Sequence, residues 1–286
     1  MGVRIVTDST SYIDRQVRKD LNIDILPLSV SFENESIRET DIGNKEFYRK
    51  MELEGIPFSA QPSAGEVHQK MVDIVSKGHD LVCVFLSSAM SGTYNTACQI
   101  RQEVLGEFRD AKIHIIDSRS NSMQLGFAAI VGARAAKAGK AVEEVAQMVE
   151  ANIKRSRFLF IPDNLEYLKK GGRIGGAGAL IGDIFKIIPL LTVKDGETTI
   201  LKKVRTKARA VKAMIDKILE DNYKYIVKEI AVHHINCYEQ AEKLATKLKD
   251  KFNKTISIVD IGPVIGMHVG PGAIGIVYYT EDEIID

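Results

Sequence analysis

The segment SSAMSGTYNTA, residues 87–97, is the part of the chain whose residue types point most directly to chemistry. Six of its eleven side chains carry a hydroxyl group, and none is an acid, a base or a metal ligand. A serine nucleophile would need a general base within reach, whereas a helix start needs only one capping hydroxyl. Ser91 is the natural N-cap of a following helix, whose free amides would favour an anion. We interpret the segment as either a hydroxyl-rich turn or a binding site.

Two further loops carry side chains that require an explanation. In FSAQPSAGE, Ser63 and Glu66 have the spacing of a capping box, which leaves Ser59 unexplained. In VIGMHVGPG, His268 stands among glycines and a proline, where the backbone can approach a ligand closely. A single histidine is more often structural than functional, so both interpretations of His268 remain open.

The glycine-rich segment KKGGRIGGAGALIG, residues 169–182, invites comparison with a dinucleotide-binding loop. That fingerprint requires G-x-G-x-x-G directly after a strand. Here the glycines follow a helical stretch, and Ile181 stands where the spacing needs glycine. The dinucleotide interpretation is therefore weak.

Alternating strand and helix patterns must position these loops. Strands are expected at VRIVTDS, IDILPLSV, DLVCVFL and KIHIID, and helices around FYRKMELEG, EVHQKMVDIVSKG, TYNTACQIRQEVLG and EEVAQMVEANIKR. This alternation predicts an α/β fold with a mostly parallel or mixed sheet flanked by helices. The segment 87–97 follows a strand and opens a helix, which is where ligands bind in such sheets.

A second block of the chain begins at RFLFIP. It contains a predicted hairpin over residues 188–204, with Asp195 and Gly196 at the turn, and two helices and three strands are expected after it. We therefore expect two α/β domains, residues 1–155 and 156–286, packed together with a cleft between them. The hydroxyl-rich loops would belong to the first domain, and the hairpin and His268 to the second.

Length and composition exclude several classes of protein. A chain of 286 residues suits roughly two domains, and a net charge of +1 gives no reason to expect nucleic acid or an anionic membrane as partner. The three cysteines, Cys83, Cys98 and Cys237, form no metal-like cluster and suit a reducing compartment. No targeting signal is recognised, and no apolar stretch reaches the ~20 residues of a membrane span. We expect a cytoplasmic protein without stable membrane insertion.

Seven motifs of this sequence together resemble the DegV family. They are VTDSTSYI, QPS, SGTY, IDS, LEYLKKGGRI, KVR and GPVIGMHVGPGAIG, and they cover the chain from about Val3 to Tyr279. The resemblance implies a two-domain α/β protein that binds one long-chain fatty acid in the interdomain region. It also implies a carrier without turnover, cofactor or metal. Such a carrier presents the acid to a separate ATP-dependent kinase, which makes acyl-phosphate for phospholipid synthesis.

The resemblance assigns the carboxylate-binding residues to Ser59, Ser91 and His268. The family usually reads Thr-Ser-Gln-Pro-Ser, whereas Ala60 here lacks the second hydroxyl, and Ile188 stands where the family often has lysine. If His268 contacts the carboxylate, a protonated imidazole would favour the charged form of the acid. Apolar runs such as GFAAIVG and GALIGDIF are available for the tail, although such runs are more often plain core.

Two basic clusters are not explained by core packing. Their members are Lys169, Lys170, Arg173, Lys202, Lys203, Arg205, Lys207 and Arg209. The simplest interpretation is solvated surface charge. The resemblance adds that Arg173, Lys202 and Lys203 face the kinase or the ATP phosphate. Nucleic acid is disfavoured because no aromatic residues are interleaved with the charges.

Two enzymatic alternatives remain open. A serine-dependent lipid hydrolase would use Ser91 as nucleophile and His268 as base, although no G-x-S-x-G elbow is present and no acid can be assigned to orient the histidine. A phosphoryl-transfer enzyme is weaker still, because GKAVEE is not a P-loop.

Overall fold

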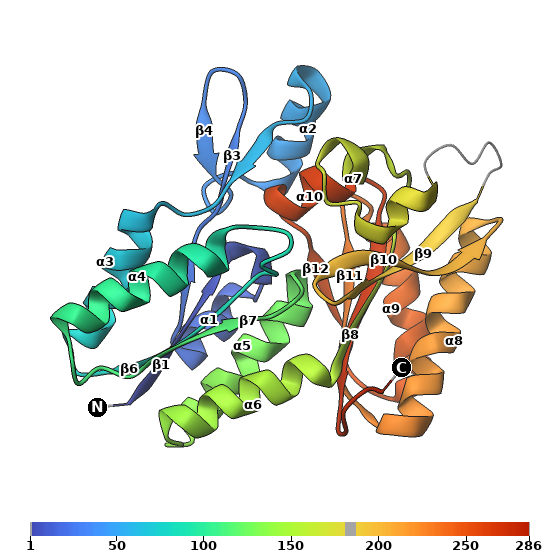
Figure 1. Cartoon of the computed structure of the whole chain (residues 1–286). Helices are drawn as coiled ribbons and strands as arrows, with labels where there is room; N and C mark the ends of the chain where they lie inside the picture. The colour runs from blue at the N-terminus through green and yellow to red at the C-terminus, as the bar shows by residue number, and fades with distance from the viewer. Residues whose placement is uncertain (1, 181–186, 286) are drawn as a thin grey trace. The chain divides into compact units, whose positions relative to one another are not determined.

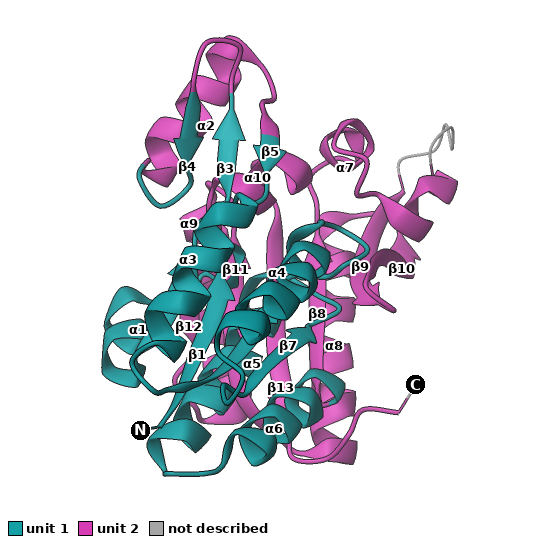
Figure 2. Cartoon of the chain, turned by 60° about the vertical axis from the view of Figure 1, so that its left-hand side comes forward, with its two compact units in different colours: residues 1–31, 36–41, 59–154 teal, residues 32–35, 42–58, 155–286 magenta. Residues whose placement is uncertain are grey.

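The computed structural model describes residues 2–180 and 187–285, and the chain forms two compact units (Figure 2). Unit 1 contains residues 1–31, 36–41 and 59–154, and unit 2 contains residues 32–35, 42–58 and 155–286. The division into domains between residues 155 and 156 stays a prediction. Two segments from the first sixty residues, 32–35 and 42–58, belong to the same unit as the second half of the chain.

Unit 1 is built on a parallel four-stranded sheet in the order β2-β1-β6-β7 (Figure 1). The strands are β1 (Val3–Asp8), β2 (Ile23–Leu26), β6 (Asp80–Phe85) and β7 (Ile113–Asp117). The central strand β6 is buried from Leu81 to Phe85, as expected for a parallel strand that is covered on both faces. The predicted strand IDILPLSV divides at Pro27 into β2 and β3 (Ser29–Ser31), because proline has no N–H for the sheet ladder.

Helices cover both faces of this sheet. They are α1 (Arg15–Leu21), α3 (Ala64–Val75), α4 (Thr93–Glu107), α5 (Ser122–Lys137) and α6 (Val142–Lys154). Val6 packs in one apolar cluster with side chains of α3 and α4, whereas its neighbour Ile5 approaches Gly132 of α5. Successive strand residues point to opposite faces, so α3 and α4 lie on one side of the sheet and α5 on the other. The predicted capping box of Ser63 and Glu66 is confirmed at the start of α3.

The first sixty residues also form a small three-stranded sheet in the order β4-β3-β5. Besides β3, it contains β4 (Ser36–Arg38) and β5 (Phe58–Ala60), and β5 carries Ser59. A short 3-10 turn, η1 (Ser9–Ser11), follows β1. The helix expected at FYRKMELEG is α2 (Asn44–Glu54), which belongs to unit 2.

Unit 2 contains a mixed six-stranded sheet in the order β10-β9-β8-β13-β11-β12. The strands are β8 (Ser156–Ile161), β9 (Ile188–Lys194), β10 (Glu197–Val204), β11 (Val227–His234), β12 (Ser257–Asp260) and β13 (Ile274–Thr280). Its neighbours pair antiparallel except for β11 and β12. The long helices α8 (Lys207–Tyr225) and α9 (Tyr238–Phe252) pack on it through one apolar cluster. The predicted α/β fold with helix-flanked sheets is confirmed.

The predicted hairpin is present as β9 and β10. Asp195 and Gly196 connect the strands with φ angles of 53° and 88°, the left-handed values that a type I′ turn requires. The register shifts between Ile200 and Lys202, which marks a β-bulge in the middle of β10.

The second half of the chain has one more helix than expected. Among its described residues, α8, α9 and α10 (Pro263–Val269) follow the hairpin, so VIGMHVGPG is largely helical and not a glycine-rich loop. Pro263 suits the first helical position, and Gly270, at φ 88°, ends the helix. Inside the helix, a Cβ on Gly266 would overlap the Tyr48 hydroxyl of α2, so this glycine accommodates a packing contact.

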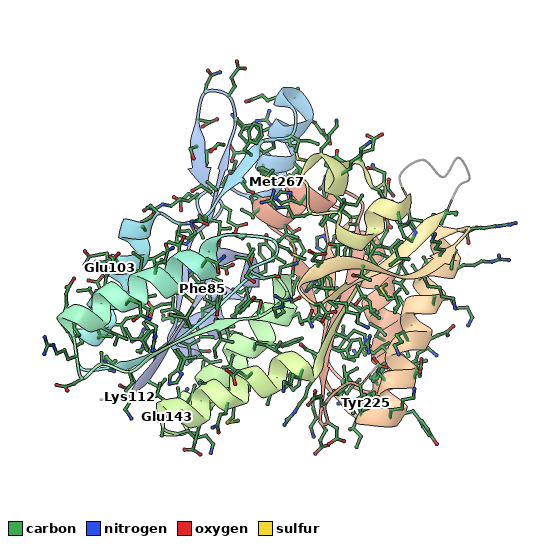
Figure 3. The ribbon with its side chains drawn as sticks, viewed as in Figure 1. Phe85, Glu103, Lys112, Glu143, Tyr225 and Met267 are labelled. Atoms are coloured by element: carbon green, nitrogen blue, oxygen red, sulfur yellow. The ribbon has the colours of Figure 1, made fainter. Side chains whose placement is uncertain are left out.

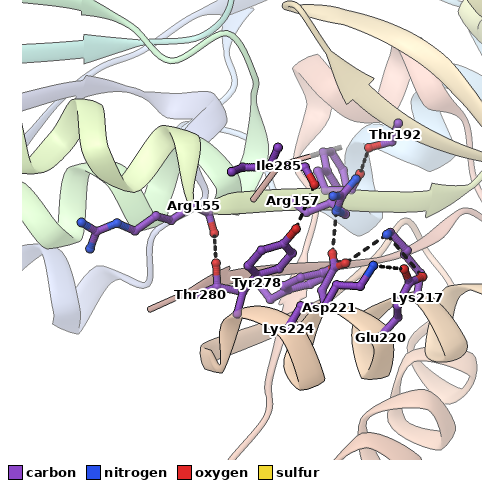
Figure 4. Close-up of polar contacts among 12 residues, drawn as sticks. Arg155, Arg157, Thr192, Lys217, Glu220, Asp221, Lys224, Tyr278, Thr280 and Ile285 are labelled. Carbon is purple, nitrogen blue, oxygen red and sulfur yellow. Dashed lines mark hydrogen bonds and ion pairs between the residues drawn. The ribbon is translucent and has the colours of Figure 1, made fainter. Parts of the chain in front are cut away.

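A buried polar network ties α8 to the sheet of unit 2 (Figure 4). Asp221 is fully buried and accepts hydrogen bonds from Arg157 Nε at 2.7 Å and from the Tyr278 hydroxyl at 2.6 Å. Lys217 Nζ lies 3.0 Å from the second carboxylate oxygen. The network therefore neutralises a carboxylate that burial alone would disfavour.

No helix in residues 2–180 or 187–285 is long and apolar enough to cross a membrane. In the same residues, no group of three or more histidine, cysteine or acidic side chains is arranged to hold a metal ion.

Candidate functional site

Polar loops follow three parallel strands of unit 1. Asp8 ends β1, Ser87 comes just after β6, and Asp117 ends β7. Carboxyl ends of parallel strands meet at one edge of a sheet, which is where α/β folds bind ligands. The Ser87 N–H donates to the Ser120 carbonyl at 2.7 Å, so the loops after β6 and β7 are directly joined. Phe85, labelled in Figure 3, is the last residue of β6 and precedes the hydroxyl-rich segment by two residues.

Asp8 joins the loop after β1 to the loop after β6. One carboxylate oxygen accepts from the Leu86 N–H at 2.8 Å, and the other accepts from the Thr10 N–H at 2.9 Å and the Thr10 hydroxyl at 2.5 Å. Complete burial raises the pKa of Asp8 to about 6, although these donors oppose the shift. The aspartate thus fixes the edge of the sheet, a role that sequence analysis did not assign.

Much of the hydroxyl-rich segment is occupied by its own hydrogen bonds. The Ser88 hydroxyl donates to Asp117 at 2.5 Å, and the Ser87 carbonyl accepts from the N–H groups of Met90 and Ser91. Ser91 Oγ lies 3.0 Å from Thr93 Oγ1. The segment is therefore an ordered turn that its own hydrogen bonds hold together.

The predicted N-cap role of Ser91 is wrong by one residue. Helix α4 begins at Thr93 with Gly92 as N-cap, and the Ser91 N–H donates to the Ser87 carbonyl in the preceding turn. Its hydroxyl still accepts from the Thr93 N–H at 3.3 Å. Ser91 thus lies beside the helix start, where the amide groups favour an anion.

The loops that carry Ser59 and Ser91 meet within unit 1. Gln61 follows Ser59 by two residues, and its Nε2 donates to Thr96 Oγ1 on α4 at 2.8 Å. A Cβ on Gly92 would overlap Gln61 Oε1. The structure therefore joins the two loops that carry Ser59 and Ser91, two of the three residues assigned to the carboxylate.

His268, the third of these residues, lies in unit 2 on the last turn of α10. Met267, labelled in Figure 3, precedes it. The side chain is buried, and a Cβ on Gly171, which ends α7 (Glu166–Lys170), would overlap its Nδ1. Burial, with a smaller effect of the Arg173 charge, lowers the pKa of His268 to about 4. Without a ligand, His268 is therefore neutral at pH 7, and a protonated imidazole beside a bound carboxylate stays a prediction.

Arg173 lies close to His268 in unit 2. Its Nη1 donates to the Gly171 carbonyl at 2.7 Å, and its guanidinium group is exposed. His268 was assigned to the carboxylate and Arg173 to the kinase or the ATP phosphate. Their proximity could not be predicted because they are nearly a hundred positions apart in the sequence. A neutral imidazole beside a permanent cation can donate to a carboxylate while the arginine supplies the charge.

Lys202 and Lys203 are exposed on β10. The segment that follows Arg173 contacts β10 nearer the start of the strand. A Cβ on Gly175 of η2 (Gly175–Leu180) would lie 2.5 Å from the Thr198 carbonyl oxygen. Four residues of strand separate Thr198 from Lys202, or about 13 Å. Lys207, a further member of the basic clusters, is paired with Asp163 at 3.1 Å.

The glycine-rich segment does not form a dinucleotide loop in its described part. Gly176 and Gly178 lie in η2, which follows α7 and packs on β10, so no strand leads into the glycines. Ile181 and Gly182 lie outside the described residues, as does the apolar run GALIGDIF from Ile181 to Phe185.

Comparisons with known proteins agree with the motifs. The sequence profile of the DegV family matches residues 2–281. A DegV domain-containing protein of Clostridium acetobutylicum is 58% identical and aligns over 98% of this chain and 99% of its own. The crystal structure of DegV, a fatty acid binding protein from Bacillus subtilis, is 30% identical, with a TM-score of 0.88 over 98% of this chain and 99% of that one. A stearic acid-binding protein from Eubacterium ventriosum is 25% identical, with a TM-score of 0.88 over 98% of both chains.

These comparisons define a two-domain α/β protein of the same fold as fatty acid-binding proteins. The chain belongs to the DegV family.

Proposed function

We propose that this protein binds one long-chain fatty acid, with Ser59, Ser91 and His268 as donors to its carboxylate. The observation that supports this most strongly is the pair of hydroxyl-bearing loops joined by Gln61 at the start of α4. Two structural relatives are described as fatty acid or stearic acid binding proteins. A carboxylate needs a few donors and no catalytic base, which is what these loops offer.

The tail supplies most of the binding free energy in this proposal. Burial contributes about 0.8 kcal/mol per methylene, so a sixteen-carbon chain gains on the order of 10 kcal/mol before ordering costs. Each hydrogen bond to the head contributes about 0.5–3 kcal/mol. The head residues therefore orient the acid more than they hold it.

Extraction of the purified protein is the direct test. Organic solvent should release about one fatty acid per chain, identified by mass spectrometry. An empty protein that takes up no added oleic or stearic acid, or one that carries a nucleotide, would contradict the proposal.

Single substitutions at the head residues should weaken binding without abolishing it. Ser91→Ala removes one donor, and we expect a roughly 5-fold loss of fatty acid affinity. His268→Ala should cost roughly 5- to 10-fold, equally at every pH from 6 to 9, because a histidine with a pKa near 4 is neutral throughout. His68→Ala, a change at a half-buried histidine of α3 that contacts Glu107, serves as control. A larger loss at pH 6 than at pH 9 would show that bound His268 is protonated.

We further propose that the carrier presents the carboxyl group to a separate ATP-dependent kinase, which forms acyl-phosphate for phospholipid synthesis. The family resemblance supports this role, and the exposed charges of Arg173, Lys202 and Lys203 suit docking or the ATP phosphate. Arg173 lies beside His268, so its reversal would disturb fatty acid binding as well. The two lysines therefore provide the cleaner test.

Lys202→Glu combined with Lys203→Glu should leave fatty acid affinity within about 2-fold while acyl-phosphate formation by the cognate kinase falls at least about 10-fold. Reversal of Lys243 and Lys247, exposed on α9, is the matched control. Equal loss in both assays would assign the lysines to the ligand or to the fold.

A serine-dependent hydrolase remains the second candidate. The described hydrogen bonds of Ser91 Oγ lead to Thr93, which can accept and orient but cannot act as a general base. A lipid esterase assay should show no turnover by the pure protein, and turnover that Ser91→Ala abolishes would favour the hydrolase.

A further inference from the structure

The side chain of Gln61 spans the first turn of α4. Its Nε2 donates to Thr96 Oγ1 at 2.8 Å, and its Oε1 occupies the space where a Cβ on Gly92 would lie. The Thr96 N–H donates to the Gly92 carbonyl at 2.9 Å, so these two residues are one helical turn apart on the same face. One amide group therefore contacts both ends of this turn.

Gly92 has no conformational need to be glycine. Its φ of −76° and ψ of −5° are accessible to any residue. A Cβ at this position would overlap the amide oxygen of Gln61 and would require that flexible side chain to move. The glycine therefore provides the space in which Gln61 lies.

The backbone around Gln61 is held on both sides. The preceding residues 58–60 form β5, and the following Pro62 is buried and leads into the Ser63 cap of α3. A residue before proline is restricted to extended conformations. In an extended chain, residues two apart point to the same side, so Ser59 and Gln61 face the same way.

We propose that Gln61 is a positioning residue, which fixes the spacing between the hydroxyls of Ser59 and Ser91 by holding the β5 loop against the start of α4. The inference rests on the proposed function, because the spacing matters only if both hydroxyls contact one carboxylate. Gln61 itself acts through the two serines and through the Gly92 contact.

Fatty acid affinity tests the positioning role. Gln61→Ala should weaken oleic acid binding roughly 3- to 10-fold, because one hydrogen bond to the helix is lost. Thr96→Val removes the acceptor and should give the same loss, and Gly92→Ala displaces the amide and should do likewise. The double variant of Gln61→Ala and Gly92→Ala should bind no worse than either single variant, because both substitutions remove the same contact between Gln61 and α4. Gln69→Ala, which removes the hydrogen bond to Asp73 on the exposed face of α3, is the matched control.

A second set of measurements separates positioning from donation. In the Ser59→Ala background, Gln61→Ala should add less than about 2-fold, since the hydroxyl that it positions is gone. In the ligand-free protein, hydrogen exchange at residues 92–97 should rise in Gln61→Ala and in Thr96→Val but not in Gln69→Ala. Circular dichroism and the thermal midpoint should stay as in the wild type.

Two outcomes would overturn the inference while leaving the proposed function intact. One is wild-type affinity in Gln61→Ala, and the other is an additive loss with Gly92→Ala. If the wild-type protein binds no fatty acid, the proposed function fails. The exchange measurement then decides whether Gln61 holds the two loops together, and unchanged exchange in Gln61→Ala would refute that contact as well.

Discussion

Asp221→Ala is expected to lower the free energy of unfolding by about 3–5 kcal/mol. The substitution removes the carboxylate that accepts hydrogen bonds from Arg157 and Tyr278. It takes the ion pair with Asp221 away from the Arg157 side chain, which is only 6% exposed. Breaking a buried ion pair by removing one partner costs far more than the pair itself contributes. Urea denaturation followed by circular dichroism measures the loss.

Asp216→Ala, on the same helix, is the control for this prediction. Its carboxylate pairs with Lys212 at 2.7 Å on an exposed face, and we expect a change within about 0.5 kcal/mol. Equal losses in the two variants would mean that the buried network contributes no more than a surface pair.

His233→Leu should reduce the acid sensitivity of the fold by about 2 kcal/mol between pH 7 and pH 5. The imidazole is fully buried on β11 with its ring edge-on to Phe158 at 5.2 Å. Neither ring nitrogen has a hydrogen-bond partner among the described residues. Burial lowers the pKa of His233 to about 3, so the side chain is neutral in the folded protein across this range.

The sign follows from proton binding in the two states. The unfolded chain takes up a proton near pH 6.5, while the folded protein does not until about pH 3. The stability that neutral His233 retains above pH 6.5 is therefore lost as pH falls, at about 1.4 kcal/mol per pH unit. Leucine binds no proton and abolishes this loss. His268, with its pKa near 4, contributes in the same direction.

Asp8 acts in the opposite direction over the same pH range. Burial raises its pKa to about 6, so protonation below pH 6 favours the folded state. The unfolding free energy of the wild type therefore contains opposing pH-dependent contributions. Only the difference between the wild type and His233→Leu reports on His233. Unfolding free energies at pH 7 and pH 5 provide that difference, with His68→Leu, at a half-buried histidine, as control. A difference that stays constant with pH would contradict a neutral buried His233.

Local patterns were sufficient to predict many elements of the fold. The hairpin at Asp195 and Gly196 and the capping box of Ser63 and Glu66 depend on residues within a few positions of each other, and both are confirmed. Helix α10 was missed because the three glycines of VIGMHVGPG suggested a loop. The reason for one of them, the Tyr48 hydroxyl against Gly266, lies more than two hundred positions away.

The candidate site was predictable as a set of residue types but not as an arrangement. Residue types alone did not show that the N-cap of α4 is Gly92 and not Ser91. The contact of Gln61 with α4 joins segments some thirty positions apart, which no local pattern reveals. The neutral state of His268 depended on burial, which no local pattern reveals. The assignments of Ser59, Ser91 and His268 to a carboxylate stay predictions.

The grouping of residues 42–58 with unit 2 bears on how the chain is made. Helix α2 leaves the ribosome about two hundred residues before α10, yet Tyr48 donates to the Ile261 carbonyl at 2.8 Å in the finished protein. Helix α2 must therefore wait without its partner while residues 59–154 of unit 1 are synthesised. Contacts between such distant segments form late because their loop must close first. Unit 2 is thus completed only near the end of translation, and a fragment that starts at residue 156 would lack α2.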